Sequence, residues 1–340
     1  MEKSLLSTDI ESILLRNHDF FDDLKDEHFL ILGASGFIGS WVTEVLLQAN
    51  IKLGKRLRVT AVCRKASKLS EKISSINDGN LSVVEIDLTI ANLEKLKSSR
   101  GYDFILHAAT STKINEPIYH DNELVLSTSR LLQNLGTFKD SQNKIIHLSS
   151  GALNNLAVPE AYLKLDEGYS STSISTHDRY LQTKIEIEKL VKDATTAKLF
   201  SGSNPRLYTF YGPNFPLNEH YAIGNFMRQA ITENSITVNG HPDTIRSYMY
   251  PTDAISWIFT IWKNPPNYLV NIGSKHSITI RNLAETISTF FGGIKIMYNE
   301  TSELPTEYLP DTSVIEKNFS VSELVPLEDG LSRWKKWLTQ

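Results

Sequence analysis

Residues 28–46 read HFLILGASGFIGSWVTEVL, and this stretch decides the fold of the chain. Its first five residues are an apolar run typical of a buried parallel strand, and the residues after Gly39 have the apolar spacing of a helix. In the turn between them, Gly33 permits a tight bend, Gly36 lets the backbone approach a pyrophosphate, and Gly39 lets helix and sheet pack closely. The stretch therefore predicts a strand–turn–helix unit that binds a dinucleotide at the helix N-terminus, the alternative being a purely structural turn.

The alternation of strand and helix continues along the chain. Five further apolar, β-rich runs have the length of a strand: 58–63, 81–86, 103–107, 144–148 and 206–211. Polar segments separate them, and helices are expected over 122–138 and 177–198. Such alternation indicates βαβ units with right-handed crossovers and a parallel sheet. We therefore expect an α/β fold, a Rossmann-type doubly wound parallel sheet with a smaller C-terminal substrate lobe.

The expected domain organisation has three parts. Residues 1–27 form an N-terminal helical extension, and residues 28–205 form the dinucleotide-binding Rossmann domain, to which 240–275 returns. Residues 206–239 and 276–340 form the substrate-binding lobe, where closely spaced prolines favour loops and short elements. The extension is expected to be an amphipathic helix whose apolar side carries Ile10, Ile13, Leu14 and Phe20 or Phe21.

Composition limits the classes of function. The 340 residues are 41% hydrophobic and 22% charged, which allows a sizeable core and excludes wholesale disorder. The 35 Lys and Arg against 39 Asp and Glu leave a net charge of −4, which argues against a nucleic-acid partner. The single cysteine, Cys63, excludes an internal disulfide and a Cys-rich zinc site, and no metal is expected. No apolar run has the length of a membrane span, so we expect a cytoplasmic protein without a membrane partner.

The end of the second strand bears on the choice of cofactor. Sites that prefer NAD place an acidic residue there, which accepts hydrogen bonds from the ribose 2′-hydroxyl. Here the strand ends Cys63-Arg64-Lys65, and two cations suit a 2′-phosphate, so we expect NADP, with NAD as the second choice. The alternative is that Arg64 stacks on adenine and Lys65 is solvated. Asp87 ends the third strand, where it either accepts from the adenine amino group or caps a helix that begins near Thr89.

Tyr180 and Lys184 lie four residues apart in a helical pattern, so both side chains project from one face of a helix. The pKa of a free tyrosine is about 10, and a neighbouring ammonium lowers it by stabilising the phenolate. Ser150 ends the strand region IIHLSS, where open α/β sheets place their ligands. Its hydroxyl is expected to hydrogen-bond the substrate oxygen beside the tyrosine. Taken alone, Tyr-x-x-x-Lys is equally typical of a solvated helix face.

Six motifs follow one another in order along the chain: GASGFIG, His107-Ala108-Ala109, HLSSGA, Tyr180-x-x-x-Lys184, Tyr211-Gly212-Pro213 and RSYMYPTD at 246–253. Together they resemble an extended short-chain dehydrogenase/reductase of the NAD-dependent epimerase/dehydratase family, which acts on nucleotide sugars. The resemblance runs from about residue 9 to the C-terminus. It implies a catalytic triad of Ser150, Tyr180 and Lys184, in which the tyrosine exchanges a proton with a sugar hydroxyl or ketone while a hydride passes to or from nicotinamide.

The resemblance also implies the binding residues. Lys184 would hold the nicotinamide ribose and Arg246 the diphosphate of a nucleotide sugar, unless Arg246 merely pairs with Asp243 or Asp253. The cofactor-binding residues are expected to be Gly33, Ser35, Gly36, Phe37, Ile38, Gly39, Arg64, Lys65, Asp87, Leu88, Ala108, Ala109, Tyr180 and Lys184. The substrate-binding residues are expected to be Thr110, Gly151, Asn225 and Arg246. Family members often form a homodimer through the helix that carries Tyr-x-x-x-Lys and its neighbour.

Departures from the family pattern narrow the reaction. In sugar 4,6-dehydratases the residue that matches Ser150 is followed by Asp-Glu, and the decarboxylases also rely on a glutamate there. Gly151 and Ala152 stand in these positions, and an apolar pair cannot protonate a leaving hydroxyl or remove a C5 proton. We therefore expect reduction of an NDP-4-keto-6-deoxyhexose at C4. The alternative is a 4-epimerase with tightly bound NAD, and 4,6-dehydration ranks below both.

Two further departures lie at positions that border the substrate. Leu153-Asn154-Asn155 replaces the usual Val-Tyr-Gly, and Phe210 replaces the asparagine often found before Tyr-Gly-Pro, so an uncommon sugar is expected. A non-catalytic nucleotide-binding protein is a different class, but such proteins typically lose the tyrosine or lysine. A reductase of aromatic or flavonoid-type ketones shares the GASGFIGSW turn and would not need Arg246.

Overall fold

The computed structural model describes residues 6–88, 93–96, 98, 101–109, 119–135, 143–155, 176–218 and 221–340. The chain divides into two compact units. The sheet unit comprises His18–Leu207 and Phe259–Val270, and the lobe unit comprises Met1–Asn17, Tyr208–Ile258 and Asn271–Gln340. The finer division expected from the sequence, with borders at residues 27 and 205, stays a prediction.

A six-stranded sheet in the order β3-β2-β1-β4-β5-β7 forms the centre of the sheet unit, and all neighbouring strands are parallel. The strands are β1 (His28–Leu32), β2 (Arg58–Cys63), β3 (Leu81–Glu85), β4 (Phe104–His107), β5 (Lys144–His147) and β7 (Ser201–Ser203). The chain builds outward from β1 to β3 and then returns to β4 on the other side of β1. Ligands of doubly wound sheets bind at such a switch point, outside the carboxyl ends of the strands. The expected Rossmann-type α/β fold is confirmed.

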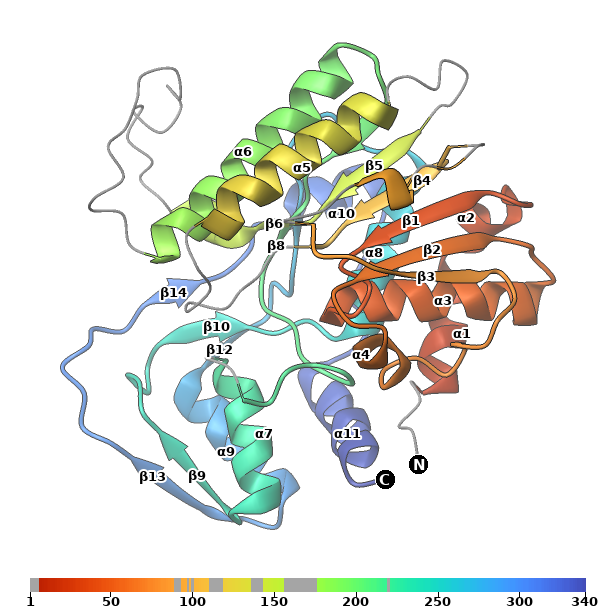
Figure 1. The fold of residues 1–340 in the computed structure, drawn as a ribbon. Coiled ribbons are helices and arrows are strands. Elements are labelled where there is room, and N and C mark those ends of the chain that lie inside the picture. The colour runs from red at the N-terminus through yellow and green to blue at the C-terminus, as the bar shows by residue number, and fades with distance from the viewer. Residues whose placement is uncertain are drawn as a thin grey trace, which may run out of the picture. The chain divides into compact units, whose positions relative to one another are not determined.

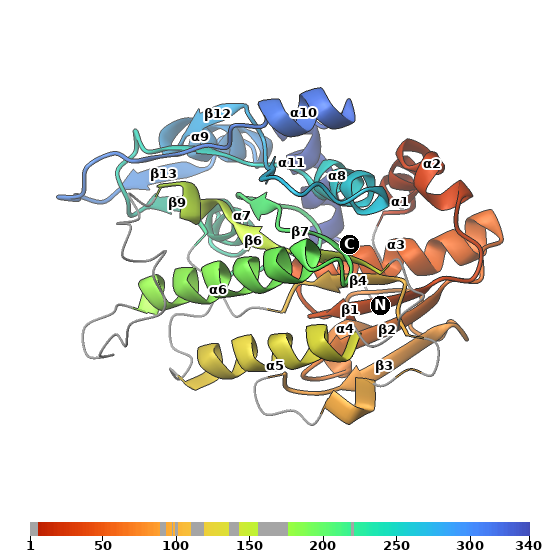
Figure 2. The same ribbon diagram turned by 90° about the horizontal axis from the view of Figure 1, so that it is seen from above.

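Helices lie on both faces of this sheet, as Figure 1 and Figure 2 show. α5 (Tyr119–Leu135) and α6 (Thr176–Thr196) lie side by side on one face, and α3 (Phe37–Leu53) lies on the other. The shorter elements of this unit are α2 (His18–Asp22), α4 (Ser67–Ser70), η1 (Leu93–Leu96), β6 (Ser149–Ser150), η2 (Gly151–Asn155) and β8 (Arg206–Leu207).

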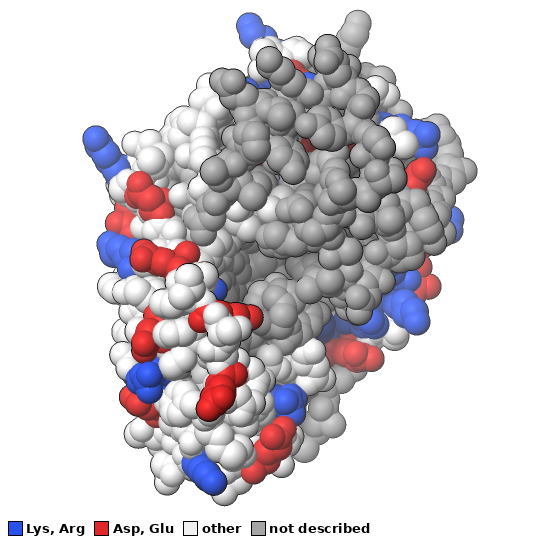
Figure 3. Space-filling model, turned by 90° about the vertical axis from the view of Figure 1, so that its left-hand side faces the viewer, with Lys and Arg blue, Asp and Glu red and all other residues white. Residues whose placement is uncertain are grey.

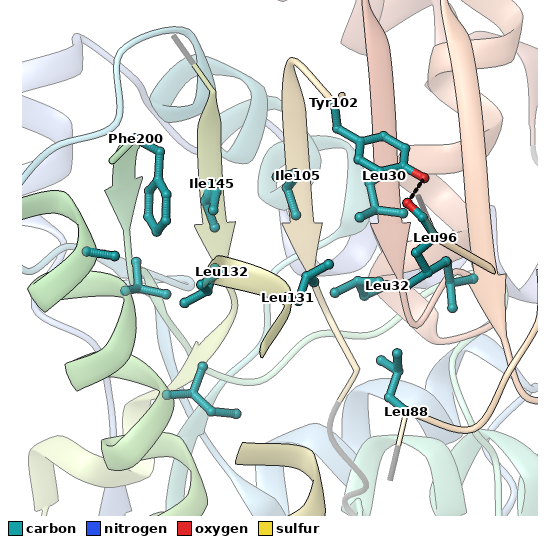
Figure 4. Close-up of a cluster of buried hydrophobic side chains, with 14 of the residues drawn as sticks. Leu30, Leu32, Leu88, Leu96, Tyr102, Ile105, Leu131, Leu132, Ile145 and Phe200 are labelled. Carbon is teal, nitrogen blue, oxygen red and sulfur yellow. Dashed lines mark hydrogen bonds between the residues drawn. The ribbon is translucent and has the colours of Figure 1, made fainter. Parts of the chain in front are cut away.

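Successive side chains of β1 point to opposite faces of the sheet, and both faces are covered. Leu30 and Leu32 point to the α5/α6 face, where they join a buried cluster (Figure 4). Its other members include Leu88, Leu96, Tyr102, Ile105, Leu131, Leu132, Ile145 and Phe200. Phe29, on the opposite face, stacks on Phe104 with ring centroids 4.8 Å apart. A strand buried on both faces must be apolar throughout, which is why residues 28–32 carry no alternating pattern.

The lobe unit contains small sheets and several helices. β10 (Ile245–Ser247) pairs with β12 (Ser277–Thr279) and β14 (Glu307–Tyr308), and β9 (Ser235–Val238) pairs with β13 (Lys295–Tyr298). α7 (Ala222–Thr232) and α9 (Ile280–Phe290) pack on β9. Its other elements are α1 (Ser7–Arg16), β11 (Asn271–Ile272), α10 (Ser313–Phe319), α11 (Leu327–Leu338) and the first turns of α8 (Pro251–Lys263). No helix in the described ranges is long and apolar enough to cross a membrane.

Buried ion pairs and hydrogen bonds connect α1 to the rest of the lobe unit. Asp9 is fully buried, and its carboxylate accepts hydrogen bonds from the Tyr250 hydroxyl at 2.8 Å and from Arg333 at 2.7 Å. Arg16 pairs with the buried Asp253 at 2.6 Å. Buried carboxylates with several donors are satisfied, but removing one partner would leave an uncompensated charge.

Two expected elements differ from the structure. The N-terminal segment is not one helix, because α1 ends at Arg16 and Asn17 leaves helical geometry while its side-chain amide donates to the Ile13 carbonyl. The expected apolar residues are all buried nevertheless. The strand expected at 206–211 is only β8, two residues long, since beyond it Phe210 forms an isolated bridge with Met249.

Candidate functional site

The glycine turn has the geometry that the sequence predicts. Gly33 has φ +82°, in the left-handed region that favours glycine. The N–H groups of Gly33 and Ala34 both donate to the Val62 carbonyl, at 3.0 and 2.9 Å, which ties the turn to the end of β2. A Cβ at Gly33 would lie 2.6 Å from the Ala108 carbonyl oxygen, and one at Gly39 would lie 2.2 Å from the Gly33 oxygen. Neither position accepts a side chain without a backbone shift.

Gly36 differs from the other two glycines. It is exposed, and an added Cβ would meet only the Gly33 oxygen, at 3.1 Å. It is also the N-cap of α3 and has no side chain with which to cap the first turn. This end of α3 therefore presents backbone to an approaching group, and the positive end of the helix dipole favours an anion there. These residues fit the pyrophosphate of a dinucleotide.

The other residues expected at the cofactor border this turn to different degrees. Ser35 and Phe37 are half-buried, as are Ala108 and Ala109 after β4. The side chains of Ile38 and Leu88 are buried, and that of Leu88 belongs to the core cluster, so only its backbone is available for a ligand. Asp87 is half-buried after β3.

Two groups that the sequence analysis missed lie near the loop after β2: Lys72, and Glu85 at the end of β3. Arg64 and Lys65 are exposed, as expected for side chains that meet a ligand or solvent. Lys72 comes back from the same loop to the glycine turn, where its ammonium donates to the Ser35 carbonyl at 2.7 Å. Glu85, opposite Cys63 in the sheet, accepts from the Ala66 N–H at 2.5 Å. A carboxylate therefore lies beside this loop, because strand register places the end of β3 there.

Ser150, Tyr180 and Lys184 come together at the carboxyl end of the sheet. The Ser150 and Tyr180 hydroxyls are hydrogen-bonded to each other. The Lys184 ammonium donates to the Leu148 carbonyl at 2.6 Å and lies 5.8 Å from the centre of the Tyr180 ring. Lys184 is 4% exposed. The three side chains are therefore positioned to act on one group, since two hydroxyls meet beside one amine.

Burial dominates the pKa values of this cluster. It lowers the pKa of Lys184 to about 7, although the Glu188 carboxylate acts in the opposite direction. It also raises the pKa of Tyr180 above its ordinary value, and the hydrogen bond from Ser150 only partly offsets this. The expected lowering of the Tyr180 pKa by Lys184 is thus not found, because burial outweighs the other effects on Tyr180 and the Lys184 amine is bonded to the Leu148 carbonyl.

A buried histidine pair lies beside Lys184. The Thr128 hydroxyl donates to the Leu124 carbonyl at 2.7 Å, so it accepts from His107 Nε2 at 2.9 Å. His107 Nδ1 then accepts from His147 Nδ1 at 3.3 Å. Burial and the charge of Lys184 lower the pKa of both rings, that of His107 to about 3. Both histidines are therefore neutral at physiological pH.

The expected substrate residues are divided between the units. Gly151 is buried at the start of η2, directly after Ser150, and Ala152 follows with its N–H donating to the Ser150 hydroxyl at 3.3 Å. Thr110 lies outside the described residues. Asn225 is half-buried in the first turn of α7, in the lobe unit.

Arg246 of β10 also belongs to the lobe unit. Its guanidinium donates to the carbonyls of Ile245 and Thr306, at 2.8 and 3.1 Å, and to the Thr306 hydroxyl at 3.0 Å. Asp243 pairs instead with Arg281 and Asp253 with Arg16, so the simple ion pair considered for Arg246 is wrong. Within the described residues these partners are neutral oxygens, which leaves the guanidinium without a carboxylate in that set.

Comparison with known proteins gives curated relatives, solved structures of the same fold and a match to a protein family. The chain is 24% identical over 332 residues to a trifunctional UDP-glucose 4,6-dehydratase/UDP-4-keto-6-deoxy-D-glucose 3,5-epimerase/UDP-4-keto-L-rhamnose-reductase of Arabidopsis thaliana. The match covers 93% of this chain and 48% of that protein, so the chain spans about half of its length.

Two solved structures share the fold. A UDP-N-acetylglucosamine 4-epimerase from Methanobrevibacter ruminantium, in complex with UDP-N-acetylmuramic acid, has a TM-score of 0.75 at 23% identity, covering 93% of this chain and 99% of that one. A mutant UDP-glucuronic acid 4-epimerase from Bacillus cereus, in complex with UDP-4-deoxy-4-fluoro-glucuronic acid and NAD, has a TM-score of 0.72 at 20% identity, covering 92% and 99%.

The family itself matches directly over residues 29–273, which include β1, the glycine turn, Ser150, Tyr180 and Lys184. This range is more than half of the chain and contains every part of the site in the sheet unit. The chain belongs to the NAD dependent epimerase/dehydratase family.

Proposed function

We propose that this chain reduces an NDP-4-keto-6-deoxyhexose at C4 with NADPH. The observation that carries the proposal is the cluster of Ser150, Tyr180 and Lys184 with Gly151 and Ala152 directly after it. The cluster supplies what proton exchange at one sugar oxygen requires. The two small apolar residues supply no acid or base for elimination of water, so the reaction ends at the ketone–alcohol step.

The residues divide the work as follows. A nicotinamide cofactor held beside Tyr180 and Lys184 would supply the hydride for C4 of the sugar. Tyr180 donates its proton to the carbonyl oxygen, and the Ser150 hydroxyl hydrogen-bonds the same oxygen and so favours its developing negative charge. Protonated Lys184 stabilises the Tyr180 phenolate that results, until solvent returns a proton. Arg246 binds the diphosphate of the substrate through charge-assisted hydrogen bonds.

The preference for NADP rests on the basic loop after β2. Arg64, Lys65 and Lys72 are cations near the turn that would hold the adenosine half of the cofactor. The Glu85 carboxylate accepts the Ala66 N–H and is one acid set against these three cations here. A 2′-phosphate would therefore meet positive charge at this place, and a reductase that consumes cofactor draws on NADPH.

The second candidate is a 4-epimerase that keeps NAD bound. Two observations favour it: the two 4-epimerases of the same fold, one with NAD in its complex, and the presence of Glu85 beside the loop. An epimerase returns the hydride that it takes and needs no supply of reduced cofactor. Purified protein would then carry tightly bound NAD.

We further propose a cytoplasmic homodimer formed through α5 and α6, in a pathway that builds polysaccharides. Leu126 of α5 is 48% exposed and lies on one of the two proposed interface helices, so a substitution there can test the contact. Figure 3 shows acidic and basic side chains interspersed on the described part of one face. A nucleic-acid partner would need clustered positive charge, so we propose none. Light scattering after size exclusion measures the subunit number, and Leu126→Glu should yield monomer.

The function is tested by a screen of nucleotide 4-keto-6-deoxy sugars with NADPH and NADH. Absorbance of the reduced nicotinamide follows turnover, and NMR identifies the product. Loss of absorbance with a new 4-hydroxyl supports the reductase. Interconversion of two sugar nucleotides without net cofactor use contradicts it and supports the epimerase.

A further inference from the structure

A single carboxylate on α6 connects several parts of the site. Glu188 lies one helical turn after Lys184. Its Oε1 accepts from the Ser149 hydroxyl at 2.5 Å and from Arg206 Nε at 3.0 Å, and its Oε2 accepts from Arg206 Nη2 at 3.0 Å. The side chains of Glu188 and Arg206 are each 18% exposed. These bonds are charge-assisted and largely withdrawn from water, so they are stronger than an exposed ion pair.

The carboxylate holds the strand that carries Ser150 against the helix that carries the other two members of the cluster. Ser149 directly precedes Ser150 in β6, and in the β6–β8 ladder Ser149 lies opposite Arg206. Arg206 also donates to the Asn154 side chain in η2, which begins at Gly151. Strand, helix and the turn after Ser150 therefore meet at Glu188.

Glu188 also governs the charge next to Lys184. His107 of β4 and His147 of β5 also face the amine, but burial and the charge of Lys184 lower the pKa of both rings, so they are neutral. On α6 itself, Glu188 raises the pKa of Lys184 against the effect of burial. Arg206, which carries the opposite charge, is bound to the same carboxylate. Of the described charges, Glu188 is the one that favours the protonated amine.

We propose that Glu188 is the positioning residue of this site: its carboxylate ties the strand of Ser150 to the helix of Tyr180 and places a negative charge next to the Lys184 amine. The inference rests on the proposed function for its catalytic meaning. Its physical content, the control of the Lys184 amine, is independent of any substrate. Arg206 and Ser149 both hold the carboxylate in place, Arg206 through its charge and Ser149 through a neutral hydrogen bond. Their substitution therefore separates the effect of charge from that of positioning.

The test follows the titration of Lys184 by NMR in the full chain grown with isotope-labelled lysine, with Lys184→Met to assign the signal. Glu188→Gln keeps the size of the side chain but removes its charge, so the midpoint should fall by about one pH unit. Arg206→Gln should raise it, since the carboxylate is then unopposed. Glu186→Gln is the matched control, because Glu186 lies on the same helix and, within the described residues, its carboxylate accepts from the Gln182 side chain instead of from Ser149 or Arg206. That variant should leave the midpoint unchanged.

Ser149→Ala separates positioning from charge. It removes one hydrogen bond to Glu188 and no charge, so the Lys184 midpoint should stay while kcat falls about tenfold with little change in KM. An unchanged Lys184 midpoint in both Glu188→Gln and Arg206→Gln would overturn the proposal, even if the chain is a reductase. If Glu188→Gln does not fold, the Arg206→Gln shift and the Ser149→Ala kinetics decide. Normal titration with no activity toward keto sugars would instead overturn only the proposed function.

Discussion

The glycine turn offers a prediction in which two neighbouring substitutions fail for different reasons. In Gly39→Ala the new methyl would lie 2.2 Å from the Gly33 oxygen and 2.9 Å from the Ala34 Cα, both backbone atoms. Backbone must move to admit it, and overpacking of this kind costs about 1–3 kcal/mol of folding stability. In Gly36→Ala the methyl meets one backbone oxygen at 3.1 Å and otherwise open space, so the stability cost should stay below about 1 kcal/mol.

For dinucleotide binding we expect the specific loss in Gly36→Ala rather than in Gly39→Ala. The Gly36→Ala methyl stands where the pyrophosphate approaches the backbone, so dinucleotide affinity should fall at least tenfold, about 1.4 kcal/mol, in a protein that remains folded. Urea unfolding measures stability, and calorimetric titration with NADP and NAD measures affinity. Unchanged affinity in Gly36→Ala, or full stability in Gly39→Ala, would refute the assignment of the turn.

Three further substitutions test the site. Tyr180→Phe should abolish turnover and leave cofactor affinity within about twofold, since one oxygen leaves the proton path; near-normal turnover would contradict this. Burial lowers the pKa of Lys184 to about 7 in the folded protein, whereas a lysine of the unfolded chain keeps its proton up to about pH 10. Above pH 7 the unfolded state therefore binds more protons than the folded state, and the free energy of unfolding should rise with pH. Between pH 7 and 9, urea unfolding should show the natural protein gaining about 2 kcal/mol relative to Lys184→Met, and parallel curves would argue against a neutral amine. Arg246→Ala should weaken nucleotide-sugar binding about tenfold or more without changing dinucleotide affinity, whereas an unchanged KM would remove Arg246 from the substrate site.

Local sequence signals predicted the sheet unit well because its apolar runs, turns and helical spacings follow one another closely along the sequence. β1 and β2 have the expected bounds, since their apolar runs are fully buried and end at a turn. The spacing of Tyr180 and Lys184 placed both on α6, and the strand before Ser150 brought it to them. Short-range periodicity sufficed for each of these.

The groups that sequence analysis missed depend on contacts between distant segments. Glu85 reaches the loop after β2 only through strand register, and Lys72 reaches Ser35 across a folded loop. The pKa of Tyr180 depends on burial, which no spacing reveals. Glu188 carried a weak signal, four residues after Lys184, but its bonds to Ser149 and Arg206 required the fold.

Net hydride transfer to the sugar is the central claim, and isotope transfer measures it directly. The protein is incubated with an NDP-4-keto-6-deoxyhexose and NADPH that carries deuterium at both positions of nicotinamide C4. The reductase predicts one deuterium at C4 of the product sugar for each cofactor oxidised, seen by mass spectrometry and NMR. Product sugar without deuterium, formed while the labelled NADPH stays intact, would contradict the account.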